Sequence, residues 1–210
     1  MKPNPICFRL SCFASLAVIT LVGCGPEREK TAEPTIAQAE PTIAQAEPKP
    51  TVIKISDDAF RMAAYEGKLE TVRKAIESGT DVNAVDSVKS LTALHMAAYN
   101  GHSEIVKFLL EHDATVDCRD NEGKTPLIHA CTGPFAKTVE ILLDAGAQLN
   151  ATESTESFTP LMMAAGLGQI EVVKVLLARN ADKSILDQDN DLAIDHARNS
   201  GHTEIVKLLE

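Results

Sequence analysis

The sequence predicts an all-α solenoid of about five helix–turn–helix repeats joined by inter-repeat loops. Three observations carry this prediction. An Ala-rich segment recurs every 33 or 34 residues, with its central alanine at Ala63, Ala97, Ala130, Ala164 and Ala197. The text around that alanine also recurs, most clearly at residues 92–117, 125–150 and 159–184. Aromatic residues make up only 4% of a chain that is 44% hydrophobic, which suits units that pack only against their neighbours.

The first helix of each unit is expected to begin at a threonine followed by Pro or Ala, as at Thr125 and Thr159. The threonine hydroxyl can accept a hydrogen bond from a free backbone N–H, and proline has no N–H to leave unpaired. Glycine adopts a left-handed backbone at little cost, so glycines are predicted to end these helices at Gly67, Gly101, Gly168 and Gly201. Pro134 and Phe135 replace the expected Gly and His in the third unit, which makes its turn the hardest to predict.

The second helix of each unit has apolar residues at positions i, i+1, i+4 and i+5, such as Ile105, Val106, Leu109 and Leu110. This spacing predicts one buried face. Its other face pairs an acid with a base three residues later, as in Glu104 and Lys107, which is typical of a solvated surface.

These segments resemble the ankyrin repeat, and the resemblance extends from Ser56 to Glu210. It divides this region into units at residues 56–89, 90–122, 123–156, 157–189 and 190–210. The resemblance implies a surface for protein–protein interaction, formed by the loop tips and the concave face of the first helices. It also implies structural roles for His95, His102 and His202, with His95 bracing the preceding loop. The first unit carries Arg61 at that position.

The predicted partner-binding surface is centred on the first three repeats. The two tyrosines of the chain, Tyr65 and Tyr99, take the same concave position in adjacent repeats, beside Glu66 and Asn100. Tyrosine is enriched at interface hot spots because it joins rigid apolar area to a polar tip. The alternative is that both rings merely cover the neighbouring helix. The loops add further candidates to the surface: Val85, Val88, Arg119, Asn121, Glu122 and Lys124.

Residues 1–23 are predicted to form a lipoprotein signal peptide. Lys2 and Arg9 precede an uncharged apolar run at residues 10–22, which is too short to cross a bilayer. The run ends in Leu-Val-Gly-Cys at residues 21–24, which resembles the bacterial lipobox. That resemblance implies lipidation of Cys24 and a location in the bacterial cell envelope. Gly25 favours the outer membrane, facing the periplasm. An ordinary signal peptide with an incidental cysteine, or a short buried helix, is the alternative.

Residues 24–55 are expected to join this anchor to the repeats. The segment contains two copies of AEPTIAQ, at residues 32–38 and 39–45. The proline in each copy excludes a continuous helix, so the sequence predicts an extended tether rich in Pro, Ala and Glu.

Composition and motifs argue against other functions. The net charge of −10 and the lack of a basic segment argue against nucleic-acid binding. No sequence motif indicates a catalytic residue, a metal site, a cofactor or a small-molecule substrate. His129 and His196 share one helix position two repeats apart, too far apart to bind one metal. A disulfide between Cys118 and Cys131 is not favoured, because one lies in a loop and the other on a packed helix.

We therefore expect a monomeric, non-enzymatic protein that binds a protein partner of unknown identity. One alternative is an accessory or immunity protein that binds and modulates a single periplasmic enzyme or toxin. A hydrolase formed by loop carboxylates is a third and weaker hypothesis.

Overall fold

The computed structural model describes residues 54–210. The predicted signal peptide, Cys24 and nearly all of the predicted tether lie outside the described residues. Within residues 54–210 the chain forms ten helices and no strand, so the predicted all-α solenoid of five repeats is confirmed. None of these ten helices combines the length and apolar character that crossing a membrane requires.

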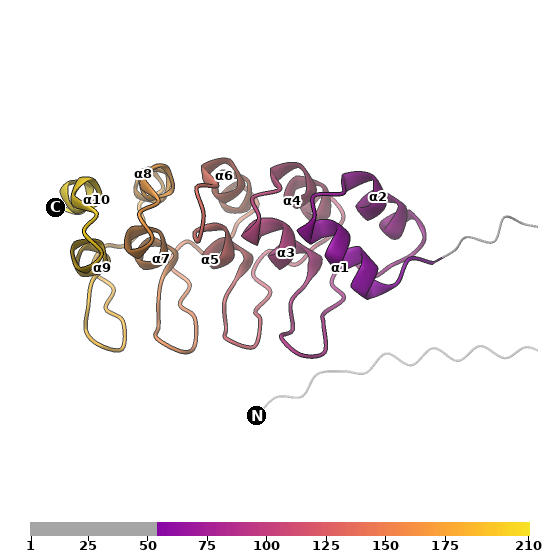
Figure 1. The fold of residues 1–210 in the computed structure, drawn as a ribbon, viewed down its shortest axis with the longest axis horizontal. Helices are drawn as coiled ribbons and strands as arrows, with labels where there is room; N and C mark the ends of the chain where they lie inside the picture. The colour runs from indigo at the N-terminus through magenta and orange to yellow at the C-terminus, as the bar shows by residue number, and fades with distance from the viewer. Residues whose placement is uncertain (1–53) are drawn as a thin grey trace, which may run out of the picture. The chain divides into compact units, whose positions relative to one another are not determined.

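Each repeat contributes one pair of helices. The pairs are α1 (Asp57–Tyr65) with α2 (Leu69–Glu77), α3 (Ala93–Tyr99) with α4 (Ser103–Leu110), α5 (Pro126–Ala130) with α6 (Ala136–Asp144), α7 (Pro160–Gly166) with α8 (Ile170–Ala178), and α9 (Ala193–Asn199) with α10 (Thr203–Leu209). The first helices form one row and the second helices form another, and the inter-repeat loops project from the first row on the side away from the second (Figure 1).

Small residues let adjacent first helices pack closely. Ala97 and Ala98 in α3, and Ala164 and Ala165 in α7, are fully buried between neighbouring helices. The second helices bury the predicted apolar face, with Val106, Leu109, Val172 and Leu176 completely inaccessible to solvent. The core is therefore a thin layer that runs along the solenoid between the two rows.

The first helices begin where the sequence predicts for the middle repeats. Thr92, Thr125 and Thr159 each accept a hydrogen bond on the side-chain oxygen from the backbone N–H three residues later. The end repeats differ. α1 starts earlier, with Ser56 as its cap. At α9 the Asp195 carboxylate accepts the Leu192 N–H at 3.1 Å instead.

The third repeat keeps its packing although its turn departs from the pattern. Gly101 has a φ of 70°, and the Phe135 ring lies over it where a Cβ would otherwise sit. The His102 ring covers Gly67 in the same way, so phenylalanine occupies the place of the expected histidine. His102 Nε2 also donates to the Tyr65 carbonyl at 2.9 Å, a bond that phenylalanine cannot make. The third repeat therefore keeps the ring packing and gives up one hydrogen bond to its neighbour.

The expectation that His95 braces the preceding loop is wrong. Its Nε2 donates to the carbonyl of Lys124, at 3.2 Å, which belongs to the following loop. Its Nδ1 accepts the Thr92 N–H at 3.2 Å. A side chain in the first turn points back towards the start of its helix, and stacking of the repeats places the following loop beside that end. Arg61 contacts its following loop as well, through the Ala84 carbonyl.

Candidate functional site

Each inter-repeat loop is organised by one acidic side chain, at Asp86, Asp120, Glu153 or Asp187. In the first loop, the Asp86 carboxylate accepts the N–H groups of Val88 and Lys89 on Oδ1 and that of Leu91 on Oδ2, at 2.7–2.9 Å. These bonds, above all the one from Lys89, hold the pKa of Asp86 below its usual value. The loops are therefore fixed by internal hydrogen bonds and form a rigid edge to the concave face.

Main-chain hydrogen bonds join each loop to the next. The Asn121 N–H donates to the Lys89 carbonyl at 3.0 Å, the Ser154 N–H to the Glu122 carbonyl at 2.8 Å, and the Gln188 N–H to the Glu156 carbonyl at 3.1 Å. We call this series the loop ladder. Two predicted partner-binding residues reinforce it. Asn121 donates its side-chain amide to the Val88 carbonyl, and Arg119 donates its guanidinium to the carbonyls of Gly123 and Thr152. Both side chains thus have a role within the fold.

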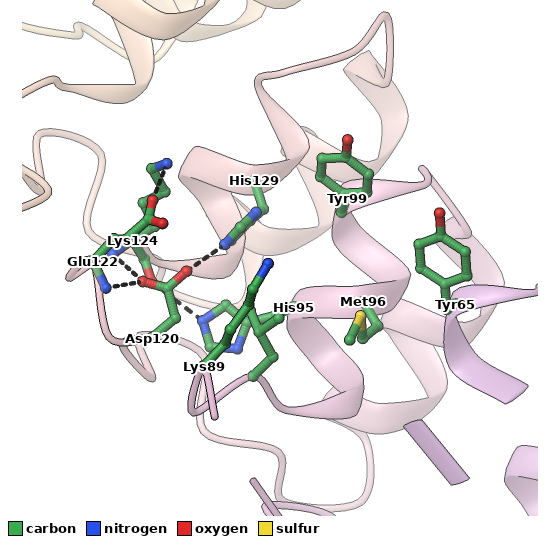
Figure 2. Close-up of a pocket in the computed structure, with 10 residues that line it drawn as sticks. Tyr65, Lys89, His95, Met96, Tyr99, Asp120, Glu122, Lys124 and His129 are labelled. Atoms are coloured by element: carbon green, nitrogen blue, oxygen red, sulfur yellow. Dashed lines mark hydrogen bonds and ion pairs between the residues drawn. The ribbon is translucent and has the colours of Figure 1, made fainter. Parts of the chain in front are cut away.

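A cavity of about 390 Å³ lies on the concave face of the first three repeats (Figure 2). It is bounded by α1, α3 and α5 and by the loops that follow α2 and α4. Four of the predicted partner-binding residues line it: Tyr65, Tyr99, Glu122 and Lys124. Six further residues complete the lining: Lys89, Leu91, His95, Met96, Asp120 and His129. The structure therefore brings the two tyrosines and part of the second loop into one pocket.

Two neutral histidines stand at the centre of this pocket. Burial lowers the pKa of His95 from 6.5 to about 4, and burial also lowers the pKa of His129. His129 donates from Nε2 to Asp120 Oδ2 at 2.8 Å. Its ring meets His95 edge to face at 5.4 Å and Tyr99 at 6.0 Å between centroids. The Tyr99 ring is thereby packed from one side while its hydroxyl points outward (Figure 2).

The other predicted binding residues lie around the pocket rather than in its lining. Glu66 forms an ion pair with Lys68 at 2.6 Å, and Asn100 donates its side-chain amide to the Tyr65 carbonyl at 2.7 Å. Val85 and Val88 are 55% and 74% exposed in the first loop. The two valines form a separate apolar tip that a larger partner could cover.

Asp120 and His129 were not predicted as part of this site, although the sequence carries a signal for them. Asp187 and His196 form the same contact in the last repeat, at 2.7 Å and with the same nine-residue separation. A loop aspartate followed nine residues later by a helix histidine thus indicates that the histidine ring donates a hydrogen bond to the aspartate carboxylate. Lys89 and Met96 carry no comparable signal, because many surface positions have the same residue types.

The carboxylate of Asp120 is held by hydrogen bonds within the fold. Asp120 accepts the backbone N–H groups of Glu122 and Lys124 on Oδ1 and the His129 imidazole on Oδ2, so both of its oxygens are occupied. Within residues 54–210, no group of three or more His, Cys, Asp or Glu side chains is placed to hold a metal ion. Cys118 and Cys131 are both free thiols, and burial raises the pKa of each above its usual value.

Comparison with known proteins places these repeats in a family. A protein named E3 ubiquitin-protein ligase XBAT34, from Arabidopsis thaliana, is 39% identical over 93 residues, which are 43% of this chain and 25% of that protein. Ankyrin repeat and SAM domain-containing protein 6 of Rattus norvegicus is 32% identical over 96 residues, 45% of this chain and 11% of that protein. Inversin of Danio rerio is 38% identical over 66 residues, 31% of this chain and 6% of that protein.

These matches cover a quarter or less of each relative's length, so they concern the repeats alone. The family model described as ankyrin repeats in three copies matches residues 60–153 and again residues 137–210. Together the two matches begin within α1 and include all the helices that follow it. The chain belongs to the ankyrin-repeat family.

Proposed function

We propose that this chain is a lipid-anchored envelope protein that presents its ankyrin repeats to a protein partner and acts without catalysis. Ankyrin repeats indicate a role in protein–protein interaction. The observation that supports a defined binding site is the pocket on the first three repeats, where both tyrosines of the chain stand half exposed, at 41% and 47%. The absence of catalysis is supported by the sequence, in which no catalytic motif occurs.

A rigid pocket of this kind favours binding for an entropic reason. The loop ladder and the acid-centred loops fix the walls before any partner arrives, so little conformational freedom is lost on association. Tyrosine has only two side-chain dihedrals to order, so it adds contact area at a low entropic cost. Tyr65 and Tyr99 are therefore the side chains expected to carry the largest share of the binding energy.

The experiment compares two double variants in a pull-down from solubilised envelope. Tyr65→Ala with Tyr99→Ala is expected to weaken capture of the partner about tenfold or more, as truncation of a hot spot does. Leu167→Ala with Leu186→Ala is the matched control, because both leucines are about half exposed but lie outside the pocket lining. Equal capture by the tyrosine variant, with its thermal unfolding unchanged, would contradict the proposed site.

The lipid anchor is supported by the sequence of residues 1–24, where a basic start, an apolar run and a lipobox-like ending occur in order. Two or more acyl chains hold a protein at a bilayer firmly, whereas one chain binds only marginally. Expression of the full chain in a Gram-negative host is expected to place it in the membrane fraction. The full chain is expected to incorporate labelled palmitate and Cys24→Ser is not, and equal labelling of that variant would count against the anchor.

A further inference from the structure

Three hydrogen-bond donors on the rim of the pocket have no partner within the part of the chain that the structure describes. They are the ammonium of Lys89 and the hydroxyls of Tyr65 and Tyr99. In Figure 2 the ends of all three side chains point in the same general direction. Lys89 comes from the first loop and the tyrosines come from the C-terminal ends of α1 and α3. The rim therefore gathers donors from three separate segments.

The acids of the same pocket already have partners within the fold. Asp120 is saturated by two backbone N–H groups and the His129 imidazole. Its side chain is only 6% exposed, which leaves it little contact with an incoming group. Glu122 forms an ion pair with Lys124. The hydrogen-bonding capacity left on the rim is thus that of donors, and the exposed charge without an ion-pair partner is the Lys89 ammonium.

The lining between these donors is apolar. Leu91, Met96 and the faces of the two tyrosine rings contribute to it. A cavity of about 390 Å³ lies at the lower end of the range for small-ligand pockets, roughly 300–1,000 Å³. That volume accommodates a few side chains of one short segment rather than a folded domain.

We propose that the protein partner enters this pocket with an extended segment that carries an acidic side chain flanked by apolar side chains. The carboxylate contacts Lys89 and the tyrosine hydroxyls, and the apolar side chains cover Leu91 and Met96. This inference rests on the proposed function and adds the chemistry of the partner. The net charge of the chain is −10, but screening limits distant charges to a range of about 8 Å at physiological salt. Lys89 is the charged group that an incoming side chain can reach at the rim, because Asp120 is buried and Glu122 is paired.

The test is a selection of random heptapeptides, displayed on phage, against the immobilised full chain. Peptides with Asp or Glu between apolar residues are expected to be enriched. Lys89→Glu is expected to abolish that enrichment or replace it with enrichment of Lys and Arg. Lys137→Glu is the control, because this substitution makes the same change in net charge. Lys137 is an exposed lysine on α6, which lies in the other row of helices. Its selected peptides are expected to match those of the unaltered chain.

The result separates this inference from the proposed function. Enrichment of basic or uncharged peptides, or no enrichment at all, overturns the inference. The same holds for an acidic preference that Lys89→Glu leaves unchanged. If the tyrosine double variant nevertheless loses the partner in the pull-down, the binding site stands and only the acidic chemistry of the partner is wrong. If both experiments fail, the pocket is not the binding site.

Discussion

The inter-repeat loops of this protein are of two kinds, which satisfy the same carboxylate in different ways. In the longer loops, at residues 86–91 and 153–158, the acid accepts three backbone N–H groups. In the shorter loops, at residues 120–124 and 187–191, it accepts two. There the remaining oxygen accepts the N–H of a histidine on the next first helix, His129 or His196.

The difference shows that loop length is coupled to one position on the following helix. That position is Met96 or Met163 after a longer loop and His129 or His196 after a shorter one. The extra loop residue brings a third backbone donor, and backbone N–H groups then occupy both carboxylate oxygens. Without that residue the imidazole supplies the donor. The Asp120–His129 pair that lines the pocket is thus a consequence of the short second loop.

Removing the acid of a longer loop should have the largest effect on stability. Glu153 is only 3% exposed. Its burial alone would raise its pKa, but hydrogen bonds from Thr155, Phe158 and Glu156 hold the pKa below its usual value. Glu153→Ala leaves these donors unpaired, so we expect a loss of about 3 kcal/mol in urea denaturation. Glu156→Ala, an exposed neighbour in the same loop, should change the unfolding free energy by less than about 0.5 kcal/mol.

Lowering the pH should destabilise the second repeat before the loop carboxylates become protonated. The pKa of His95 falls from 6.5 to about 4 on folding, so the folded chain favours the neutral imidazole. The stability that this contributes is complete above pH 6.5 and is lost as the pH falls towards 4. Between pH 7 and pH 5 we expect a loss of about 2 kcal/mol in the unfolding free energy. The His95→Gln variant should lose less than half as much over that interval, and an equally steep decline would exclude this origin.

Replacing the histidine after a short loop with the residue found after a long loop should cost less. His129→Met removes the donor to Asp120 Oδ2 and leaves that oxygen buried without a partner. We expect a loss of about 1.5 kcal/mol in unfolding free energy, measured by urea denaturation at pH 7. An unchanged midpoint would mean that water replaces the imidazole, and the coupling between loop length and helix residue would lose its energetic basis.

The reverse replacement should have the smallest effect. Met96→His places an imidazole after a long loop, where the Leu91 N–H already occupies Asp86 Oδ2. No unpaired oxygen of Asp86 faces the new side chain, so the stability should change by less than about 0.5 kcal/mol. A gain of about 1 kcal/mol or more in the same denaturation experiment would show that the long loop does not satisfy its carboxylate.

The fold was predictable because its signals are local and repeated. Threonine caps, paired alanines and terminal glycines act within a few residues, and their recurrence fixes the register of all five units. The loop that His95 contacts was not predictable in the same way. It depends on which of two neighbouring loops stacks against the start of α3, and the sequence of one repeat contains no information on that choice.

The candidate site was predictable only in part. The shared concave position of Tyr65 and Tyr99 follows from the repeat spacing, and the structure places both rings in one pocket. The intramolecular roles of Arg119 and Asn121 could not be deduced, because their acceptors are main-chain carbonyls of the adjacent loops. Backbone acceptors look the same at every position of a sequence, so contacts to them are visible only in three dimensions.

The loop ladder also bears on how such a protein can change its length and its partner. Its bonds join an N–H of one loop to a carbonyl of the preceding loop, and any residue other than proline supplies both atoms. When a repeat is duplicated or deleted, the main-chain part of the new junction can therefore form without a matching change of side chains. The side chains of the concave face stay free to vary under selection for binding. Because the main-chain bonds do not depend on those side chains, one scaffold can acquire a new partner without first losing its fold.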